Sequence, residues 1–398
     1  MNLIYQILIR CYGAIIYIAS PFSLKARQWL VGRKNLENNL PDGNNVKIIW
    51  FHCASLGEYI QAKPLINALK ERHSEHKTLI TFFSPSGYLN AGNDKNVDFK
   101  AYIPLDTLAN AQDFLDRTKP KIAIFIKSEL WPNFFKKLHQ RSIPTFVVSA
   151  IFKRQHYLFK FYGKWHLNIL NDVSHFFVQN EESKTLLNKK EIHQVTVSGD
   201  NRYDKVYEGS LQIQEIPLIT SFKSSHPLVV AGSTYKIDSK MLINISKRMP
   251  KVKFILVPHH TELCDDLKKH GLLYSQANKD NIRNHSILII DSIGVLSQLY
   301  QYADASYIGG AFGNGLHNIL EAIAFGSYVL FGPKYHNYEE AKEAIHAGIG
   351  QSIKNEYELE SAIKQLIDNS YNKNDALAFI SKRKGANKMI IKALNDTI

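Results

Sequence analysis

Two glutamates and a glycine-rich block are the residues of this chain whose types and spacing could do chemistry. Glu58 follows an apolar run that ends at Phe51, and Glu129 follows the apolar run 122–126. A carboxylate just past a strand can act as a general base, or it can simply cap the first turn of a helix. Both interpretations stay open for each glutamate. The block 309–322 couples glycines to an expected helix start, where free N–H groups favour an anion.

The second half of the chain offers further polar turns suited to a nucleotide. Ser233 and Thr234 end one apolar run and bring small side chains and free amides, and Pro258 and His259 end the next. Backbone N–H groups in such turns can bind a phosphate. Turn formation alone would explain the same residues, so the pattern indicates a phosphate site only together with other features.

Inside the glycine-rich block, His317, Asn318 and Glu321 could exchange hydrogen bonds with a phosphate or a ribose. The adjacent pair His259 and His260 would suit a metal, but no carboxylate or cysteine accompanies it at a recognised metal spacing. The three cysteines are widely separated and indicate neither a metal site nor a disulfide framework. The sequence therefore predicts no metal.

The length and net charge of the chain limit the number of domains and the kinds of partner to be expected. A chain of 398 residues exceeds the usual size of one core, so two domains are expected. The formal net charge of +13 implies an anionic partner, which could be a nucleic acid, a membrane surface or a phosphorylated substrate. No recognised RNA- or DNA-binding motif is present, and we expect no nucleic acid.

The first twenty residues have an amphipathic pattern. Arg10 interrupts the apolar run and Pro21 stops it, whereas a membrane span needs about 20 mainly apolar residues. We expect residues 1–24 to form a helix that lies on a membrane surface, with a core helix or a cleaved signal peptide as alternatives. The expected apolar face consists of Ile4, Ile7, Leu8, Cys11, Ile15 and Ile18. The basic residues that follow, and that suit anionic headgroups, are Lys25, Arg27, Arg33 and Lys34.

Short apolar strands alternate with helical patterns twice along the chain, which predicts two parallel sheets flanked by helices. The polar, aperiodic stretch 200–225 is expected to link them, and 382–394 to form a last helix. Ligands of doubly wound sheets bind outside the carboxyl ends of the strands, so we expect the candidate groups at a cleft between two such domains. The predicted strands are 46–53, 78–83, 122–126, 145–149, 175–178 and 195–198, then 228–231, 254–257, 287–290, 305–308 and 328–331.

Several ordered motifs together resemble one family. They are Trp-Phe-His-Cys-Ala-Ser-Leu-Gly-Glu at 50–58, Ser-Glu-Leu-Trp-Pro-Asn at 128–133, Gly-Asp-Asn-Arg-Tyr-Asp at 199–204, the block 309–321, and Phe-Gly-Pro at 331–333. In this order the chain resembles, nearly end to end, the Kdo transferases, which transfer 3-deoxy-D-manno-octulosonic acid. The resemblance implies the two-domain GT-B glycosyltransferase fold and transfer of Kdo from CMP-Kdo to a lipid A precursor in lipopolysaccharide biosynthesis.

The resemblance also implies roles for the residues of the first domain. Glu58 matches the glutamate that closes the family's Ala-Ser-x-Gly-Glu motif, and this match assigns it as the general base of an inverting displacement. Ser55 and Gly57 of the same motif are expected on the acceptor side. Glu129 matches a glutamate that is important in the family, and it would position a substrate or tune Glu58 electrostatically.

On the donor side, the resemblance implies that Glu321 accepts hydrogen bonds from the ribose of CMP. Backbone amides near Ser233 and at a helix start from Gly315 to Asn318 would stabilise the departing phosphate. No metal is expected, because the helix dipole and N–H donors can take over a cation's part in stabilising that charge. No cofactor is expected either, because CMP-Kdo is a co-substrate. The implied donor-binding set is Ser233, Thr234, Pro258, His259, Ile293, Gly294, Val295, Gly315, His317, Asn318, Ile319, Leu320 and Glu321.

Three departures from the family pattern affect individual contacts. His259 stands where the family usually has an arginine, Lys127 and Ser128 replace the more usual Glu-Thr, and residues 314–316 differ from the usual Gly-Gly. The departures leave the expected activity in place, but the fold alone does not fix the nucleotide, and two alternatives to Kdo transfer stay open. One is a GT-B glycosyltransferase or epimerase that uses a UDP-sugar, and the other is a non-catalytic basic protein that binds membranes or nucleic acid.

The expected domain organisation is a membrane-associated helix at 1–24, an acceptor-binding Rossmann-like domain at 25–205, a linker at 206–225, and a CMP-Kdo-binding Rossmann-like domain at 226–398, whose last helix could pack on the first domain. The expected partners are CMP-Kdo, a lipid A precursor and an anionic membrane surface. The expected location is the cytoplasmic face of the inner membrane, with attachment through the N-terminal helix.

Overall fold

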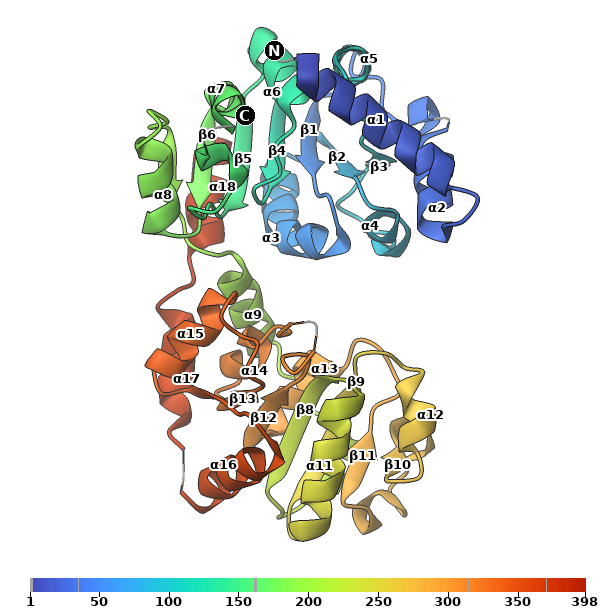
Figure 1. Cartoon of the computed structure of the whole chain (residues 1–398), viewed down its shortest axis with the longest axis vertical. Coiled ribbons are helices and arrows are strands. Elements are labelled where there is room, and N and C mark those ends of the chain that lie inside the picture. The colour runs from blue at the N-terminus through green and yellow to red at the C-terminus, as the bar shows by residue number, and fades with distance from the viewer. Residues whose placement is uncertain (1–2, 35, 161–162, 314, 370) are drawn as a thin grey trace. The chain divides into compact units, whose positions relative to one another are not determined.

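The computed structural model describes residues 3–34, 36–160, 163–313, 315–369 and 371–398 (Figure 1). The chain divides into two compact units. The first unit comprises Met1–Asp204 together with Lys384–Ile398, and the second comprises Lys205–Arg383. Each unit is built on its own parallel sheet, and each is described here by itself.

The sheet of the first unit has seven strands within the described residues, in the order β3-β2-β1-β4-β5-β6-β7, and all its pairings are parallel. The chain reverses its direction of travel across the sheet between β1 and β4. Such a switch point leaves a crevice at the carboxyl ends of the two strands, where ligands of these sheets bind. The strands are β1 (Ile48–His52), β2 (Lys77–Phe82), β3 (Phe99–Tyr102), β4 (Ile122–Ile126), β5 (Thr145–Ala150), β6 (His175–Val178) and β7 (Val195–Val197).

Helices cover both faces of this sheet because its central strands are apolar on both sides. In β1, Ile48 and Trp50 pack in a cluster with residues of α5 and α6, whereas Ile49 and Phe51 pack in a second cluster with residues of α3 and α18. The helices of the first unit are α1 (Leu3–Ala19), α2 (Leu24–Arg33), α3 (Leu56–Arg72), α4 (Pro85–Asn90), α5 (Leu108–Thr118), α6 (Pro132–Gln140), α7 (Lys164–Leu170), α8 (Glu181–Asn188) and α18 (Ala386–Asn395).

Helix α1 is attached to the first unit through polar side chains. The Tyr5 hydroxyl donates to Asp106 Oδ2 at 2.6 Å, and Gln6 Nε2 donates to Asn133 Oδ1 at 2.9 Å. Asp106 is almost fully buried and also accepts from the backbone N–H groups of Asn133 and Phe134, both at 3.1 Å. The apolar face therefore points away from these attachments. Its exposed side chains are Ile4, Ile7, Leu8, Ile15 and Ile18.

No single helix of the described chain is long and apolar enough to cross a membrane, although α1 and α2 pass that test as a pair bent by 119°. Arg33, at the end of α2, was expected to face lipid headgroups, and that expectation was wrong. Its guanidinium stacks over the Trp29 ring at 3.7 Å and donates to the carbonyl oxygens of Phe83 and Ile103. Burial lowers the pKa of Arg33 to about 9, and the residue pins α2 to the sheet instead.

The second unit has a seven-stranded sheet among its described residues, in the order β10-β11-β9-β8-β12-β13-β14, again with parallel pairings only. Here the switch point lies between β8 and β12. The strands are β8 (Leu228–Thr234), β9 (Lys253–Pro258), β10 (Leu272–Leu273), β11 (Ile287–Ile289), β12 (Ala305–Ile308), β13 (Val329–Phe331) and β14 (Gly350–Ser352).

The expected linker is not an aperiodic loop. It contains the helices α9 (Arg202–Leu211) and α10 (Pro217–Lys223), and α10 buries Ile219 and Phe222 in the second unit. The few apolar residues of these helices stand among polar ones and show no clear helical period, so the sequence pattern did not predict the helices. The remaining helices of the second unit are α11 (Lys236–Arg248), α12 (Leu263–Leu267), α13 (Leu296–Leu299), α14 (Leu320–Ala324), α15 (Glu339–His346), α16 (Glu356–Asp368) and α17 (Lys373–Ser381).

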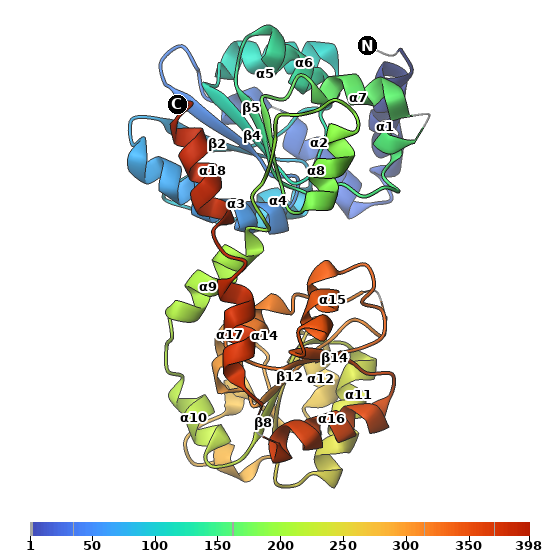
Figure 2. The same cartoon turned by 90° about the vertical axis from the view of Figure 1, so that its left-hand side faces the viewer.

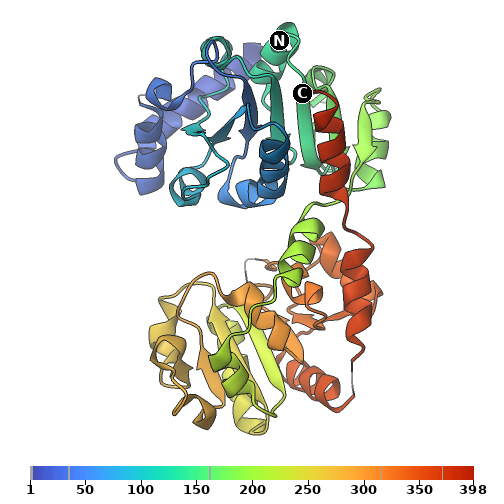
Figure 3. The same ribbon diagram turned by 180° about the vertical axis from the view of Figure 1, so that it is seen from behind.

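The last helix, α18, belongs to the first unit rather than to the domain that precedes it in sequence. Figures 2 and 3 show it beside the sheet of the first unit, and Ile390 and Leu394 join the apolar cluster that includes Leu65 and Leu69 of α3. At its start, the N–H of Gly385 donates to Asp204 Oδ1 at 2.7 Å. The C-terminal segment of the chain therefore completes the helical layer that contains α3.

Candidate active site

Glu58 lies in the first turn of α3, directly after the carboxyl end of β1. Ser55 is the N-cap residue, and the two side chains form a capping box. The Ser55 N–H donates to Glu58 Oε2 at 3.1 Å, and the Glu58 N–H donates to Ser55 Oγ at 3.5 Å. The capping role that the sequence left open is therefore real. It fixes the carboxylate in place, and only 7% of Glu58 is exposed to solvent.

The pKa of Glu58 is raised to about 7, first by burial and then by the negative charge of Glu129. The positive charge of Lys127 and hydrogen bonds from the backbone N–H groups of Ser55 and Ala54 oppose this rise. A carboxyl group with a pKa near neutrality can hold a proton and release it under ordinary conditions. Glu58 therefore has the electrostatics of a general base as well as the geometry of a cap.

Glu129 lies in the loop after β4, on the other side of the switch point. Two features hold this loop: Lys127 adopts a left-handed conformation with φ of 66°, and Ser128 Oγ both donates to the Ile151 carbonyl and accepts from the Ile151 N–H. Glu129 does not cap α6, whose N-cap residue is Trp131. Its carboxylate instead accepts from Trp131 Nε1 at 3.3 Å and stays partly exposed, as a substrate contact requires.

His52 connects the buried sheet to Glu129. Its ring is fully buried; Nδ1 lies 2.9 Å from the Thr81 hydroxyl, and Nε2 lies 3.7 Å from Glu129 Oε2, which is beyond hydrogen-bond range. The Thr81 hydroxyl lies closer to His52 Nδ1, at 2.9 Å, than to the Phe51 carbonyl oxygen, at 3.4 Å, so it donates its hydrogen bond to Nδ1. This assigns the ring proton to Nε2, facing the carboxylate. Burial lowers the pKa of His52 while Glu129 raises it, and the net direction is downward.

The remaining predicted residues of this motif are Ser55 and Gly57, expected on the acceptor side. Ser55 is occupied as the helix cap. Gly57 is exposed, and a Cβ at this position would meet only Ser55 Oγ, at 3.9 Å, so the glycine leaves open space above the first turn of α3. Sequence reasoning gave His52 no role of its own, although the residue stands inside the selected motif. Its signal was a histidine at the last position of a fully apolar strand.

In the second unit, side chains from three neighbouring strand ends form a stack of rings. Tyr235 follows β8, His259 follows β9, and His317 lies in the segment after β12. The Tyr235 ring stacks on His259 at a centroid distance of 5.1 Å and on His317 at 5.7 Å, and the two histidine rings are 4.4 Å apart. His317 Nε2 also lies 3.2 Å from the Tyr235 hydroxyl. The structure thus brings together two of the predicted donor-side residues.

These histidines are poor cations. Burial lowers the pKa of His317 to about 4, with His259 and His260 adding to the effect, and burial likewise lowers the pKa of His259. Near neutral pH both rings are therefore uncharged. They can stack on a planar base and offer single N–H donors, but they add no net positive charge.

A buried carboxylate holds the backbone beneath this ring stack. Asp238, in the first turn of α11, accepts from the Tyr307 hydroxyl at 2.5 Å, from the Tyr235 N–H at 2.8 Å and from the Gly310 N–H at 3.2 Å. A Cβ on Gly309 would collide with the backbone of Ser233, and Gly310 has a φ of 92°. Glycine is therefore required at 309 because the chain passes directly against β8 there, and at 310 because of its positive φ and the nearby Gly315 carbonyl.

The expected helix start from Gly315 to Asn318 was wrong. Gly315 has a φ of 134°, which is not helical, and α14 begins only at Leu320. The amides of Gly315 and His317 donate to the carbonyl oxygens of Gly310 and Gly309, at 3.2 and 3.4 Å, so these groups are already used within the loop. Asn314 lies outside the described residues.

The other predicted donor-side residues line the same sheet edge with less mutual contact. Asn318 accepts from the Leu320 N–H at 3.1 Å and donates to Glu321 at 3.2 Å, which leaves both side chains polar and accessible. Ser233, with a φ of 51°, forms a bulge in β8. The remaining residues are the buried Thr234, Pro258 and Ile319, and the loop Ile293, Gly294 and Val295, of which Ile293 is 90% exposed.

Tyr235 is the main residue that sequence reasoning missed. It stands directly after the predicted pair Ser233 and Thr234, at the strand end that faces the glycine-rich segment. An aromatic residue in such a place is common in cores, and only its contacts with the two histidines distinguish it.

Residues 25–205 match the family described as 3-deoxy-D-manno-octulosonic-acid transferase (kdotransferase). The chain is 29% identical to the 3-deoxy-D-manno-octulosonic acid transferase of Haemophilus influenzae, over 85% of this chain and 82% of that protein. It is 27% identical to the protein of the same name from Aquifex aeolicus, over 80% and 86% respectively. A bifunctional glycosyltransferase/methyltransferase of Fusobacterium nucleatum is 26% identical over 86% of this chain. The match spans only 56% of the length of that relative.

Solved structures with the same fold are more distant in sequence. A putative UDP-N-acetylglucosamine 2-epimerase from Listeria monocytogenes superimposes with a TM-score of 0.60 at 13% identity, covering 88% of this chain and 96% of the other. UDP-GlcNAc 2-epimerase from Neisseria meningitidis gives 0.59 at 15% identity, covering 88% and 100%. With the two parallel sheets described above, these similarities confirm the predicted fold of two Rossmann-like domains of the GT-B type.

Proposed function

We propose that this chain, which belongs to the family of 3-deoxy-D-manno-octulosonic-acid (Kdo) transferases and is a glycosyltransferase, transfers Kdo from CMP-Kdo to a lipid A precursor. Kdo transfer in lipopolysaccharide biosynthesis is the activity of the family. The observation that carries the finer proposal is Glu58, a buried carboxylate with a pKa of about 7 at the switch point of the first sheet. Such a group suits proton abstraction from a sugar hydroxyl.

In the proposed reaction, the hydroxyl oxygen of the acceptor attacks the anomeric carbon of Kdo on the face opposite CMP. The new C–O bond forms as the bond to the CMP phosphate oxygen breaks, and that oxygen keeps the electron pair. Glu58 takes the hydroxyl proton, and the configuration inverts. A single displacement of this kind needs one base, and the capping box holds that base in one orientation.

Glu129 is proposed to position a substrate and to tune Glu58. Its charge raises the pKa of Glu58, and its carboxylate is partly exposed. The Nε2–H of His52 faces it from the buried side, and Trp131 Nε1 donates to it. These two neighbours restrict the carboxylate to one side of the loop, where a sugar hydroxyl could donate to it.

The donor is proposed to bind the second unit at the carboxyl ends of β8, β9 and β12. Cytosine would stack near the rings of Tyr235, His259 and His317, and Glu321 would accept hydrogen bonds from the ribose. We propose that the transfer needs no metal or cofactor, and that N–H and O–H donors of the ring stack stabilise the departing phosphate. This assignment replaces the amides of Gly315 and His317, which are bonded within the loop.

We propose that α1 attaches the protein to the cytoplasmic face of the inner membrane. The support is an exposed apolar face on a helix whose polar side chains Tyr5 and Gln6 are already bonded to the first unit. Exposed apolar patches of this kind mark interaction surfaces. The adjoining basic residues Lys25, Arg27 and Lys34 are exposed and would favour anionic headgroups.

The proposal is tested by incubating the purified protein with CMP-Kdo and a tetraacylated lipid A precursor. We expect release of CMP and a lipid product heavier by one or more Kdo units, and mass spectrometry gives their number. Intact substrates in the presence of the folded protein would refute the proposal. Thermal-shift measurements with CMP and with UDP separate it from a UDP-sugar enzyme, because only the nucleotide of the true donor should protect the second unit.

A further inference from the structure

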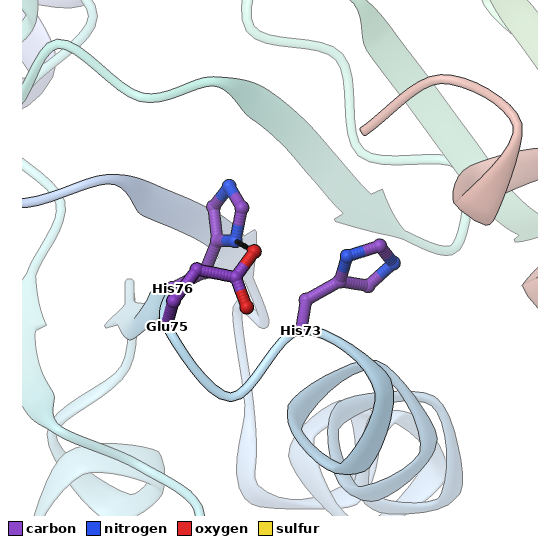
Figure 4. Close-up of side chains that lie close together, drawn as sticks. All are labelled: His73, Glu75 and His76. Atoms are coloured by element: carbon purple, nitrogen blue, oxygen red, sulfur yellow. Dashed lines mark ion pairs between the residues drawn. The ribbon is translucent and has the colours of Figure 1, made fainter.

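A cluster of three potential metal ligands lies at the opposite end of α3 from Glu58. His73 is the C-cap residue of this helix, and Glu75 and His76 follow in the turn that leads to β2. One ligand atom from each side chain lies within 4.8 Å of the other two (Figure 4). The two sites are roughly 15 residues, or about 22 Å of helix, apart. The cluster is therefore separate from the proposed reaction.

The turn itself brings these side chains together. The His76 N–H donates to the His73 carbonyl at 2.9 Å, which closes a tight turn and places the two imidazoles on one side. Their ring centroids are 5.7 Å apart with the planes at 90°. Figure 4 shows the carboxylate of Glu75 between the two rings. A cation at this point could contact all three residues without a rearrangement of the backbone.

A residue from the far end of the chain fixes the orientation of His73. His73 Nε2 lies 2.8 Å from Asn395 Oδ1, on α18. An amide oxygen only accepts, so Nε2 carries the ring proton and Nδ1 keeps its lone pair. In Figure 4 the ring presents its other nitrogen toward Glu75. Histidines that bind metals commonly donate their second N–H to an oxygen in this way.

His76 supplies the second nitrogen from a buried position. Its side chain is only 6% exposed, and Nδ1 lies 2.8 Å from Glu75 Oε1. Despite this short distance, Nδ1 makes no hydrogen bond of acceptable geometry within the described part of the chain. A buried ring nitrogen without such a bond, next to a carboxylate, is an unusual arrangement. A metal ion bound by both atoms would satisfy it.

We propose that His73, Glu75 and His76 bind one Zn²⁺ or a similar first-row transition metal ion, with a water molecule completing the coordination. Two imidazole nitrogens and one carboxylate oxygen suit Zn²⁺, whereas Mg²⁺ and Ca²⁺ prefer oxygen ligands only. The metal would join the end of α3 to the start of β2 and, through Asn395, to α18. Its role would be to stabilise the first unit.

The test uses untagged full-length protein, stripped with a chelator and then titrated with Zn²⁺ by calorimetry. We expect the unmodified protein to bind one Zn²⁺ per chain, and His73→Ala and His76→Ala to lose this binding. Glu75→Gln, a change at an exposed position, should bind Zn²⁺ more weakly. Asn395→Ala should weaken binding roughly 10- to 100-fold, since it removes only the orienting contact. His139→Ala, which removes an exposed histidine of α6, is the control and should bind as the unmodified protein does.

Thermal unfolding provides a second readout. All four tryptophans of the chain lie in the first unit, so their fluorescence reports its unfolding. Zn²⁺ should raise the unfolding temperature of the unmodified protein and of His139→Ala but not of His73→Ala. No binding by the unmodified protein, or equal binding by the folded variants Glu75→Gln and His73→Ala, would overturn the proposal. Kdo transfer should be the same with and without Zn²⁺, so this outcome is independent of the proposed function.

Discussion

Replacing Glu58 by glutamine should abolish Kdo transfer and, at the same time, stabilise the first unit at alkaline pH. Glutamine can keep both hydrogen bonds of the capping box with Ser55, because its side chain has the same length and retains a carbonyl oxygen. It cannot take a proton from the acceptor. The substitution therefore separates the capping role of this position from its proposed chemical role.

The size of the stabilisation follows from the pKa. The rise from 4.5 to about 7 means that ionising Glu58 in the folded protein costs about 3 kcal/mol more than in the unfolded chain. As pH rises, the unfolded chain loses this proton first, so the folded state loses stability between about pH 4.5 and pH 7. Glu58→Gln removes that loss. We expect the variant to be more stable by up to about 3 kcal/mol at pH 8, and unchanged at pH 4.

Urea unfolding followed by tryptophan fluorescence measures this difference, because all four tryptophans lie in the first unit. Glu71→Gln is the matched control, since Glu71 is an exposed carboxylate on the same helix. It should change neither stability nor rate appreciably. Equal stability of Glu58→Gln and the unmodified protein at pH 8 would refute the reasoning about burial, and a full transfer rate in Glu58→Gln would exclude this residue as the base.

Three further predictions concern other parts of the molecule. Glu129→Gln removes a charge that raises the pKa of Glu58, so the acidic limb of the pH profile of kcat/KM should move to lower pH; an unmoved limb would contradict the coupling. Asp238→Ala leaves the buried Tyr307 hydroxyl and Gly310 N–H unpaired and should destabilise the second unit by about 1–3 kcal/mol for each, which calorimetry would detect as a lower transition for that unit only. Substituting Ile15 and Ile18 by glutamate should weaken sedimentation with anionic vesicles, and unchanged binding would exclude α1 as the attachment.

The central strands of both sheets could be predicted from sequence because they are buried on both faces and are continuously apolar. Among the strands of the described residues, β3, β10 and β14 escaped prediction. All three lie at sheet edges. There β3 includes a lysine, β10 has two residues, and β14 reads Gly-Gln-Ser. Edge strands pair on one side only, so packing places little demand on their side chains, and the hydrophobic pattern fades.

Some features of the candidate site could likewise be predicted from the sequence, and others could not. The positions of Glu58 and Glu129 could be predicted, because each follows a recognisable strand next to the switch point. The pKa of Glu58 could not, since it depends on burial and on the loop conformation of Lys127. The hydrogen bonds of the turn after β12 could not be predicted either. Its backbone N–H groups donate to carbonyl oxygens within the turn, and the glycine pattern is the same for a turn whose N–H groups are free to bind a ligand.

One buried carboxylate connects the N-terminal helix to the loop that carries Glu129. Asp106 binds Tyr5 of α1 on one side and the first backbone N–H groups of α6 on the other, only a few residues beyond Glu129. A displacement of α1 would therefore alter hydrogen bonds at the start of α6, next to the segment that carries Glu129. Attachment of this helix to a membrane and readiness of the loop for reaction would then be one linked equilibrium rather than two independent ones.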